Sequence, residues 1–263
     1  MIDVQHLQKS FQAGSQTIRA VDDISFHVSA AEVFGLLGPN GAGKTTTMRM
    51  ILGLLRADSG YAAIGGYRSD QYPDEVKKRV GFVSANAGTY QWLTPREILT
   101  FFGDVYGLRL ETIRQRIDEL AELLAIGPFL DQRSSTLSTG QRQRINLARA
   151  LVHDPPVMLL DEPTLGLDVI GSQVIFDYIQ MLCARQKAII LCTHSLDQAQ
   201  RICHRFALLH QGQIVQMGRL EELQQRTGRE HLVDMFVDLL RASSGSLLAG
   251  GWESHAAAGG ARG

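Results

Sequence analysis

Long hydrophobic runs are absent from this sequence of 263 residues. The best apolar stretches, residues 157–160 and 188–192, have the length of a β-strand. They fall far short of the roughly 20 residues that a membrane-spanning helix needs. The opening residues Met1–Asp3 do not begin a signal peptide. We therefore expect a chain that is soluble by itself, although it can still dock on a membrane protein.

An excess of one charge sign is also missing. The chain has 26 Lys and Arg residues against 27 Asp and Glu residues, so its formal net charge is −1. Proteins that bind nucleic acid usually display a strong positive surface charge. The charge balance therefore gives no reason to expect nucleic acid as a partner.

Cysteine is scarce, and its spacing is uninformative for metal or disulfide chemistry. The three cysteines are Cys183, Cys192 and Cys203, and no two of them form a CxxC pair. An odd number of scattered cysteines in apolar surroundings indicates reduced, buried thiols. We expect neither a disulfide framework nor a zinc site.

What the sequence does have is an alternation of strands and helices. Hydrophobic residues make up 44% of the chain, enough for one large domain or two small lobes that share a sheet. Residues 1–34 are expected to form short strands joined by a polar turn at 12–16. After residue 136, helices alternate with strands, which is typical of a parallel sheet covered on both faces. The expected helices there are 139–152, 169–184 and 196–203, and the expected strands are 157–161, 188–192, 206–210 and 213–217.

A helical segment interrupts this pattern at about residues 86–135. Thr94, Pro95 and Glu97 form a strong helix start, with Thr94 as N-cap and Glu97 completing a capping box. Similar boxes are expected at Ser138 with Gln141 and at Ser195 with Gln198. Residues 219–241 are predicted to be a helical appendix, and residues 242–263, of which 16 are Gly, Ala or Ser, a disordered tail.

The stretch GPNGAGKT follows the apolar run 33–37 and precedes a helical pattern. It matches the phosphate loop in both residue types and context. Glycine lets backbone N–H groups turn toward an anion, and the following helix adds its positive dipole end. Lys44 would reach the β- and γ-phosphates, and the Thr45 hydroxyl would hold Mg²⁺. The alternative is a glycine-rich turn with an incidental lysine. The predicted nucleotide-binding residues here are Gly38, Pro39, Asn40, Gly41, Ala42, Gly43, Lys44, Thr45 and Thr46.

Two carboxylates end the predicted strand 157–161, in the stretch VMLLDEPT. Ligands bind at this end of the strands in open α/β sheets. Asp161 would hold Mg²⁺, and Glu162 would polarise the attacking water. The alternative is an exposed acidic strand end without a catalytic role. Together with the phosphate loop, these residues indicate a hydrolase that acts on nucleotide phosphates.

The stretch LSTGQRQR narrows the class. Ser138, Gly140 and Gln141 begin a helix that can bind an anion, in a chain whose phosphate loop already provides one such start. Here the sequence resembles the ABC ATPase family, whose signature motif this is. The alternative, for the motif alone, is an ordinary amphipathic helix start. The resemblance covers residues 2–220 and implies a P-loop NTPase (RecA-like) α/β fold: a parallel sheet core, an N-terminal antiparallel β lobe and an inserted α-helical lobe.

The resemblance also implies a head-to-tail dimer and further site residues. The signature of one subunit would cap the γ-phosphate bound by the other. Phe11 occupies the position of the aromatic residue that stacks on adenine, although a core role is the alternative. Asp168 resembles the loop that crosses the dimer interface. His194 resembles the histidine that contacts the γ-phosphate, while a lone histidine is usually structural.

One position departs from the family pattern. A glutamine usually follows the strand VGFVS, but this chain has Ala85 there and Asn86 next. Alanine can ligate neither a metal nor a water, so the coupling between nucleotide and helical lobe is in question. The surrounding sequence resembles the NatA-like and related ABC-2 exporters.

The resemblance implies an ATP-hydrolysing subunit that uses ATP and Mg²⁺ and drives a separate integral membrane permease. Its expected place is the cytoplasmic face of the cell membrane. Its expected partner is a second ABC ATPase subunit. A homodimer is possible because one chain carries both half-sites. Expected domains are 1–218 for the ATPase, 219–241 for the appendix and 242–263 for the tail. Two alternatives are a soluble ABC ATPase and a module in which ATP drives dimerisation without hydrolysis.

Overall fold

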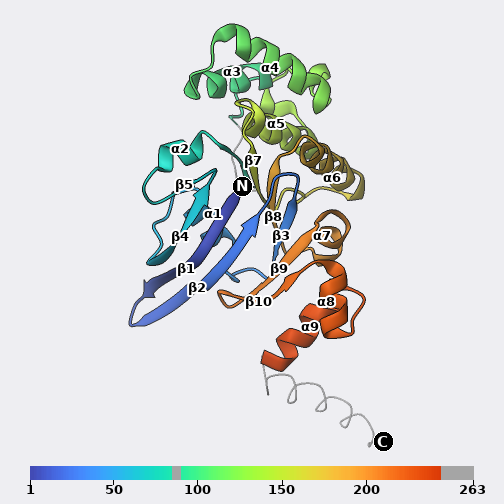
Figure 1. The fold of residues 1–263 in the computed structure, drawn as a ribbon. Helices are drawn as coiled ribbons and strands as arrows, with labels where there is room; N and C mark the ends of the chain where they lie inside the picture. The colour runs from blue at the N-terminus through green and yellow to red at the C-terminus, as the bar shows by residue number, and fades with distance from the viewer. Residues whose placement is uncertain (85–89, 244–263) are drawn as a thin grey trace, which may run out of the picture.

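The structure is a computed structural model that describes residues 1–84 and 90–243 (Figure 1). The chain forms two sheets, one antiparallel and one mostly parallel, with helices around them (Figure 1). The predicted departure at Ala85 and Asn86 lies outside the described residues. So does the predicted tail from residue 244 onward, while residues 242 and 243 are the last of helix α9.

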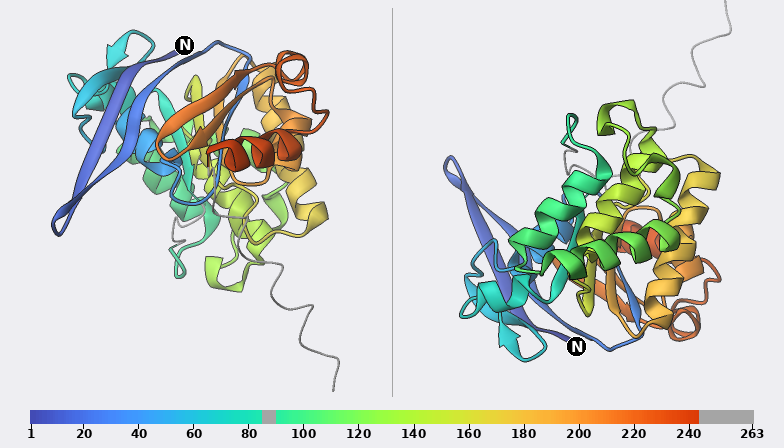
Figure 2. Two further views of the ribbon diagram at one scale, coloured as in Figure 1. Left: turned by 90° about the horizontal axis from the view of Figure 1, so that it is seen from below. Right: turned by 90° about the horizontal axis from the view of Figure 1, so that it is seen from above.

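The first sheet is antiparallel and has four strands in the order β2-β1-β4-β5. Their bounds are β1 Ile2–Ala13, β2 Gln16–Val28, β4 Ser59–Ile64 and β5 Tyr67–Arg68. The expectation of short strands was wrong here, because β1 and β2 form one long hairpin whose tip projects from the molecule (Figures 1 and 2). Register shifts between Val4 and Ser10 curve this hairpin, and such irregularities weaken the regular alternation on which the sequence reading depended.

The second sheet has six strands in the order β10-β9-β3-β8-β7-β6. Its strands are β3 Val33–Leu37, β6 Val80–Ser84, β7 Val157–Asp161, β8 Ala188–Thr193, β9 Arg205–His210 and β10 Gln213–Gly218. Neighbouring strands are parallel except for the antiparallel pair β9 and β10. The P-loop NTPase fold class with an added antiparallel lobe is therefore confirmed.

Nine α-helices are found among the described residues. They are α1 Lys44–Ile51, α2 Pro73–Lys77, α3 Pro95–Val105, α4 Leu110–Leu123, α5 Thr139–Leu151, α6 Val169–Ala184, α7 Leu196–Ile202, α8 Leu220–Thr227 and α9 Leu232–Ser243. Short 3₁₀ turns occur at Gly127–Phe129 and Ser134–Thr136. In Figure 1, α3 and α4 lie at one end of the molecule, and α8 and α9 at the other. In the described part of the chain, no helix combines the length and apolar character that crossing a bilayer requires.

Buried side chains on alternate positions of the parallel strands face two different layers. On β7, Met158 and Leu160 pack with the helices α3 to α6, while Val157 and Leu159 pack toward α1 and the antiparallel sheet. The Phe26 and Phe34 rings stack between the two sheets at 4.8 Å. Burial on both faces is the reason these strands are almost entirely apolar in sequence.

Two of the three predicted capping boxes are present. The side chain of Thr94 accepts from the Glu97 N–H group and that of Ser138 from the Gln141 N–H group, with reciprocal bonds in both cases. The third prediction was wrong, because Ser195 makes no side-chain cap. Its own N–H instead donates to the Thr193 hydroxyl, at 3.0 Å.

Candidate functional site

The phosphate-loop sequence forms a tight turn between β3 and α1. Gly41 and Gly43 have φ values of +82° and +107°, in the left-handed region that favours glycine. A β-carbon at Gly43 would also overlap the carbonyl oxygen of Ala20. No side chain caps the start of α1. The first N–H groups of this helix therefore have no side-chain acceptor, and an anion can take that place.

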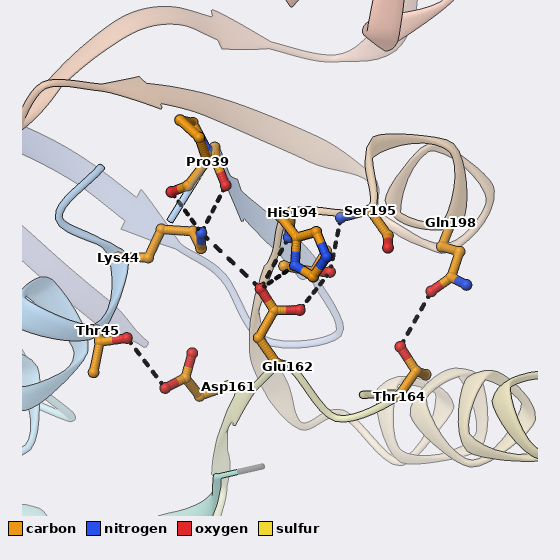
Figure 3. A network of polar contacts seen from close by, with 11 residues as sticks. Pro39, Lys44, Thr45, Asp161, Glu162, Thr164, His194, Ser195 and Gln198 are labelled. Atoms are coloured by element: carbon orange, nitrogen blue, oxygen red, sulfur yellow. Dashed lines mark hydrogen bonds and ion pairs between the residues drawn. The ribbon is translucent and has the colours of Figure 1, made fainter. Parts of the chain in front are cut away.

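Lys44 is buried under this loop, with 6% of its surface exposed. Its Nζ donates to the carbonyl oxygens of Gly38, at 2.6 Å, and Pro39, at 3.0 Å. It also lies 4.0 Å from Glu162 Oε1 (Figure 3). The ammonium group is thus held at the mouth of the loop, where a phosphate would meet it.

Asp161 ends strand β7 next to the start of α1. The Thr45 hydroxyl donates to its Oδ2 at 3.3 Å. Burial raises the pKa of this carboxyl and the charge of Glu162 adds to the rise, while the bond from Thr45 opposes it. Two hard oxygen donors beside a phosphate loop are the kind that Mg²⁺ prefers, so these residues fit that ion.

Glu162 follows directly and has φ +49°, a strained value for a residue other than glycine. Such a conformation costs about 1 to 2 kcal/mol and is typical of functional positions. Its Oε1 accepts from His194 Nδ1 at 2.8 Å and from the His194 N–H at 3.0 Å. Its Oε2 accepts from the Thr193 hydroxyl at 3.0 Å (Figure 3). The carboxylate is therefore fixed from the neighbouring strand β8.

This bonding also fixes the histidine tautomer. A carboxylate can only accept, so Nδ1 of His194 carries a proton and Nε2 is left for another partner. The imidazole is half exposed, at 47% of its side-chain surface. His194 can thus contact a ligand while it stays bonded to Glu162.

A cavity of about 300 Å³ lies over the loop. It brings together several predicted residues, namely Asn40, Gly41, Ala42, Gly43, Lys44, Thr45, Thr46, Asp161 and Glu162. Other predicted residues do not line it, namely Phe11, Gly38, Pro39, Ser138, Gly140, Gln141, Asp168 and His194. Phe11 lies on β1 with 41% of its surface exposed. On the hairpin side, the cavity is lined by Ala20.

The signature residues form a separate helix start at the beginning of α5. Ser138 and Gln141 are joined by the capping box, and Gly140 has open space around it. Gln143 on the same helix donates to the Pro163 carbonyl oxygen, at 2.7 Å, just after Glu162. Asp168 accepts from the Gly171 N–H and so caps α6. The second predicted helix start is therefore present, but its residues do not line the cavity.

The sequence analysis missed four residues that contribute to the site. Thr193 bonds Glu162, while Ala20, Ser84 and Leu165 line the cavity. Thr193 immediately precedes His194, and Ser84 pairs with Asp161 across β6 and β7. For Thr193 and Ser84, the position at the end of a parallel strand is the signal that could have identified them.

Comparison with known proteins agrees with this geometry. The ABC transporter family matches residues 21–165. The ABC transporter ATP-binding protein NatA of Bacillus subtilis (strain 168) is 36% identical over 91% of this chain and 98% of its own length. The Nod factor export ATP-binding protein I of Paraburkholderia xenovorans (strain LB400) is 40% identical over 82% of this chain and 70% of its own.

Solved structures match as well. An ATP-binding subunit of an ABC transporter gives a TM-score of 0.80 at 29% identity, covering 91% of this chain and 99% of that one. A dimeric ATP-binding cassette in a post-hydrolysis state, with ADP and Pi bound, gives a TM-score of 0.75 at 26% identity. The match covers 84% of this chain and 99% of that one.

Proposed function

Because this chain belongs to the ABC transporter family, as an ATP-binding subunit homologous to NatA and the Nod factor export proteins, we propose that it hydrolyses Mg²⁺-ATP between two copies to drive a separate membrane permease. The observation that carries the proposal is the meeting of Lys44, Asp161 and Glu162 around the phosphate loop. The ATPase unit is residues 1–218, and the cargo is set by the permease.

Each side chain has a defined role. The loop N–H groups and Lys44 bind the β- and γ-phosphates, and Thr45 and Asp161 hold Mg²⁺. When bound, the ion neutralises charge on the phosphate oxygens. Glu162 orients the attacking water, and His194 contacts the γ-phosphate through the Nε2 side of its ring. Phe11 stacks on adenine.

The second half of the site comes from another copy. Ser138, Gly140 and Gln141 lie on a surface of their own and would cap a γ-phosphate held by the partner subunit's loop. Asp168 and the start of α6 lie at the same interface. ATP therefore joins two subunits, and its hydrolysis releases them.

A groove beside the helical lobe supports a membrane permease as partner. It has a volume of about 310 Å³ and is mostly apolar, with Leu52, Val80, Phe82, Phe102 and Tyr106 among its lining residues. Nearby, Leu54 and Phe101 are more than half exposed. Apolar surface of this kind marks a protein contact. Docking there would hold the chain at the cytoplasmic face of the membrane.

The first test separates binding from hydrolysis. Glu162→Gln should keep ATP affinity but lower turnover by a factor of about 10² to 10⁴, because the water loses its base. With Mg²⁺-ATP this variant should elute as a dimer in size-exclusion chromatography, whereas Lys44→Ala should stay monomeric. Rapid turnover by Glu162→Gln would contradict the role given to this carboxylate.

The second test concerns the permease. The chain is expressed in membranes with a candidate multi-span protein from the same cell and purified through a tag on that protein. Co-purification at a fixed ratio supports the transporter subunit. A chain that hydrolyses ATP but co-purifies with no membrane protein would favour a soluble ABC ATPase, and ATP-dependent dimers without turnover would favour a non-hydrolysing module.

A further inference from the structure

We propose that the C-terminal helix α9 positions the phosphate loop, and that Phe236 acts through His210 and the turn between β9 and β10. This inference deepens the proposed function and rests on it, because it concerns the same nucleotide site. Phe236 would be a positioning residue, since it contacts neither the cavity nor a reacting atom.

The turn between β9 and β10 is bonded directly to the phosphate loop. The Gly212 N–H donates to the Ala42 carbonyl oxygen at 3.1 Å, and the Gly212 oxygen accepts from the Asp22 N–H at 2.8 Å. Gly212 has φ +81°, and a β-carbon there would lie 3.0 Å from the Ala20 oxygen. One glycine thus joins the phosphate loop to strand β2, which also lines the cavity through Ala20.

Leu209, near the end of β9, contacts the same loop. A β-carbon at Gly38 would overlap the Leu209 carbonyl oxygen, and one at Gly43 would lie 3.5 Å from Leu209 Cδ2. Leu209 therefore limits the space at the first position of the loop through its backbone and contacts the sixth position through its side chain. Any shift of residues 209–212 would therefore displace the N–H groups of the phosphate loop that are proposed to bind the phosphates.

Helix α9 holds this turn by packing. The Phe236 ring meets the His210 ring edge to face, with centroids 6.5 Å apart and an interplanar angle of 80°. Phe236 is buried, and in the described part of the chain the buried Nδ1 of His210 has no hydrogen-bond partner. Packing, rather than a hydrogen bond at this nitrogen, orients the ring.

A second contact runs through the core. Met235 and Phe236 belong to the same buried cluster as Leu37, the residue immediately before the loop. Helix α9 therefore supports both the strand that leads into the loop and the turn that is bonded to it. A loop held in its binding shape loses less conformational entropy when phosphate binds, which raises affinity.

The test compares full-length variants. Phe236→Ala and His210→Ala should each raise the KM and Kd for Mg²⁺-ATP about three- to tenfold, with kcat unchanged, because each removes the aromatic contact that positions the turn. The Kd of the double variant should be no higher than that of the single variant with the higher Kd, because both substitutions remove the same contact. His210→Phe should restore wild-type affinity. Val237→Ala, at the exposed neighbouring position of α9, is the matched control.

Each outcome is decisive. A lower melting temperature in Phe236→Ala with wild-type KM and Kd would overturn the inference and leave a structural role for the helix. So would additive effects, or no rescue by His210→Phe. Failure of the wild-type chain to bind Mg²⁺-ATP would instead overturn the proposed function, so the two failures are distinguishable.

Discussion

At the scale of single residues, the carboxylate proposed to be catalytic, that of Glu162, is held by residues at the end of β8. Glu162 receives bonds from Thr193 and from both the side chain and the backbone of His194. These bonds hold it in a strained backbone conformation that places the carboxylate over the loop. The site is therefore preorganised by residues from a strand far away in the sequence.

Thr193 provides the sharpest residue-level prediction. Thr193→Val keeps the shape but removes the hydroxyl that donates to Glu162, so kcat should fall about tenfold with little change in the KM for ATP. Thr193→Ser should restore most of the rate. Steady-state ATPase assays measure both values.

A matched control is Thr100→Val, which removes a hydroxyl bonded only within helix α3, to the Arg96 carbonyl oxygen. Wild-type kcat is expected there. If Thr193→Val also hydrolyses ATP at the wild-type rate, the hydroxyl does not position Glu162.

At the scale of elements, a histidine joins the helical lobe to the core. His153, just after α5, stacks on Tyr106 at the end of α3, with centroids 3.6 Å apart and an interplanar angle of 9°. Its Nε2 lies 3.2 Å from the Val80 carbonyl oxygen on β6. The two parts of the molecule meet at this ring.

This ring predicts a pH-dependent stability. Burial lowers the pKa of His153 from 6.5 to about 4, so the unfolded chain binds more protons between those values. The free energy of unfolding should therefore decrease as the pH falls, by about 1 to 2 kcal/mol between pH 7 and pH 5. Urea titrations at both values measure it. His153→Phe keeps the stack without the proton, and an equal loss in that variant would contradict the assignment.

The groove beside this contact holds an arginine with no carboxylate partner among the described residues. The Arg149 guanidinium packs over the Phe102 ring at 5.2 Å, and burial lowers its pKa. An acidic side chain on a docking helix of the permease would form an ion pair with Arg149. Arg149→Glu should therefore reduce co-purification of the permease at least tenfold while the isolated chain keeps its ATPase rate.

Arg114→Glu, an exposed arginine of α4, is the control with the same change of charge. Equal loss of the permease in both variants would point to net charge rather than to the groove.

Elements were predictable where their signals are local. Thr94 and Ser138 were identified as helix caps because a capping box involves only four consecutive residues. The prediction for Ser195 failed because Thr193, two residues earlier, accepts from its N–H, and because Gln198 bonds Thr164, which is a tertiary contact. The phosphate loop was identified from its residue types and spacing, together with the predicted strand before it and helix after it. The Phe236 contact with His210 could not be, since it depends on how a distant helix packs.

At the scale of the whole molecule, apolar side chains remain exposed where a second copy would pack. Val169 and Ile170, at the start of α6, are 85% and 77% exposed. They follow Asp168 directly. Large exposed apolar residues next to a site that is half complete are typical of an interface.

Val169→Asp should therefore weaken the ATP-bound dimer. In the Glu162→Gln background with Mg²⁺-ATP, the variant should elute as a monomer that still binds one nucleotide per chain, because a desolvated carboxylate destabilises the interface. Val105→Asp, at an exposed valine of the helical lobe, should remain dimeric. A dimer that persists in Val169→Asp would place the interface elsewhere.

The buried ammonium of Lys44 has a kinetic consequence. The ammonium group of Lys44 already donates hydrogen bonds to the carbonyl oxygens of Gly38 and Pro39. An incoming triphosphate must therefore replace these oxygens as the acceptor. Glu162 Oε1 lies 4.0 Å from Lys44 Nζ and offsets its charge, and the chain has a formal net charge of −1, so long-range attraction contributes little to the encounter with ATP. The association rate of ATP should accordingly vary only weakly with ionic strength, and affinity should be governed by how slowly the nucleotide escapes.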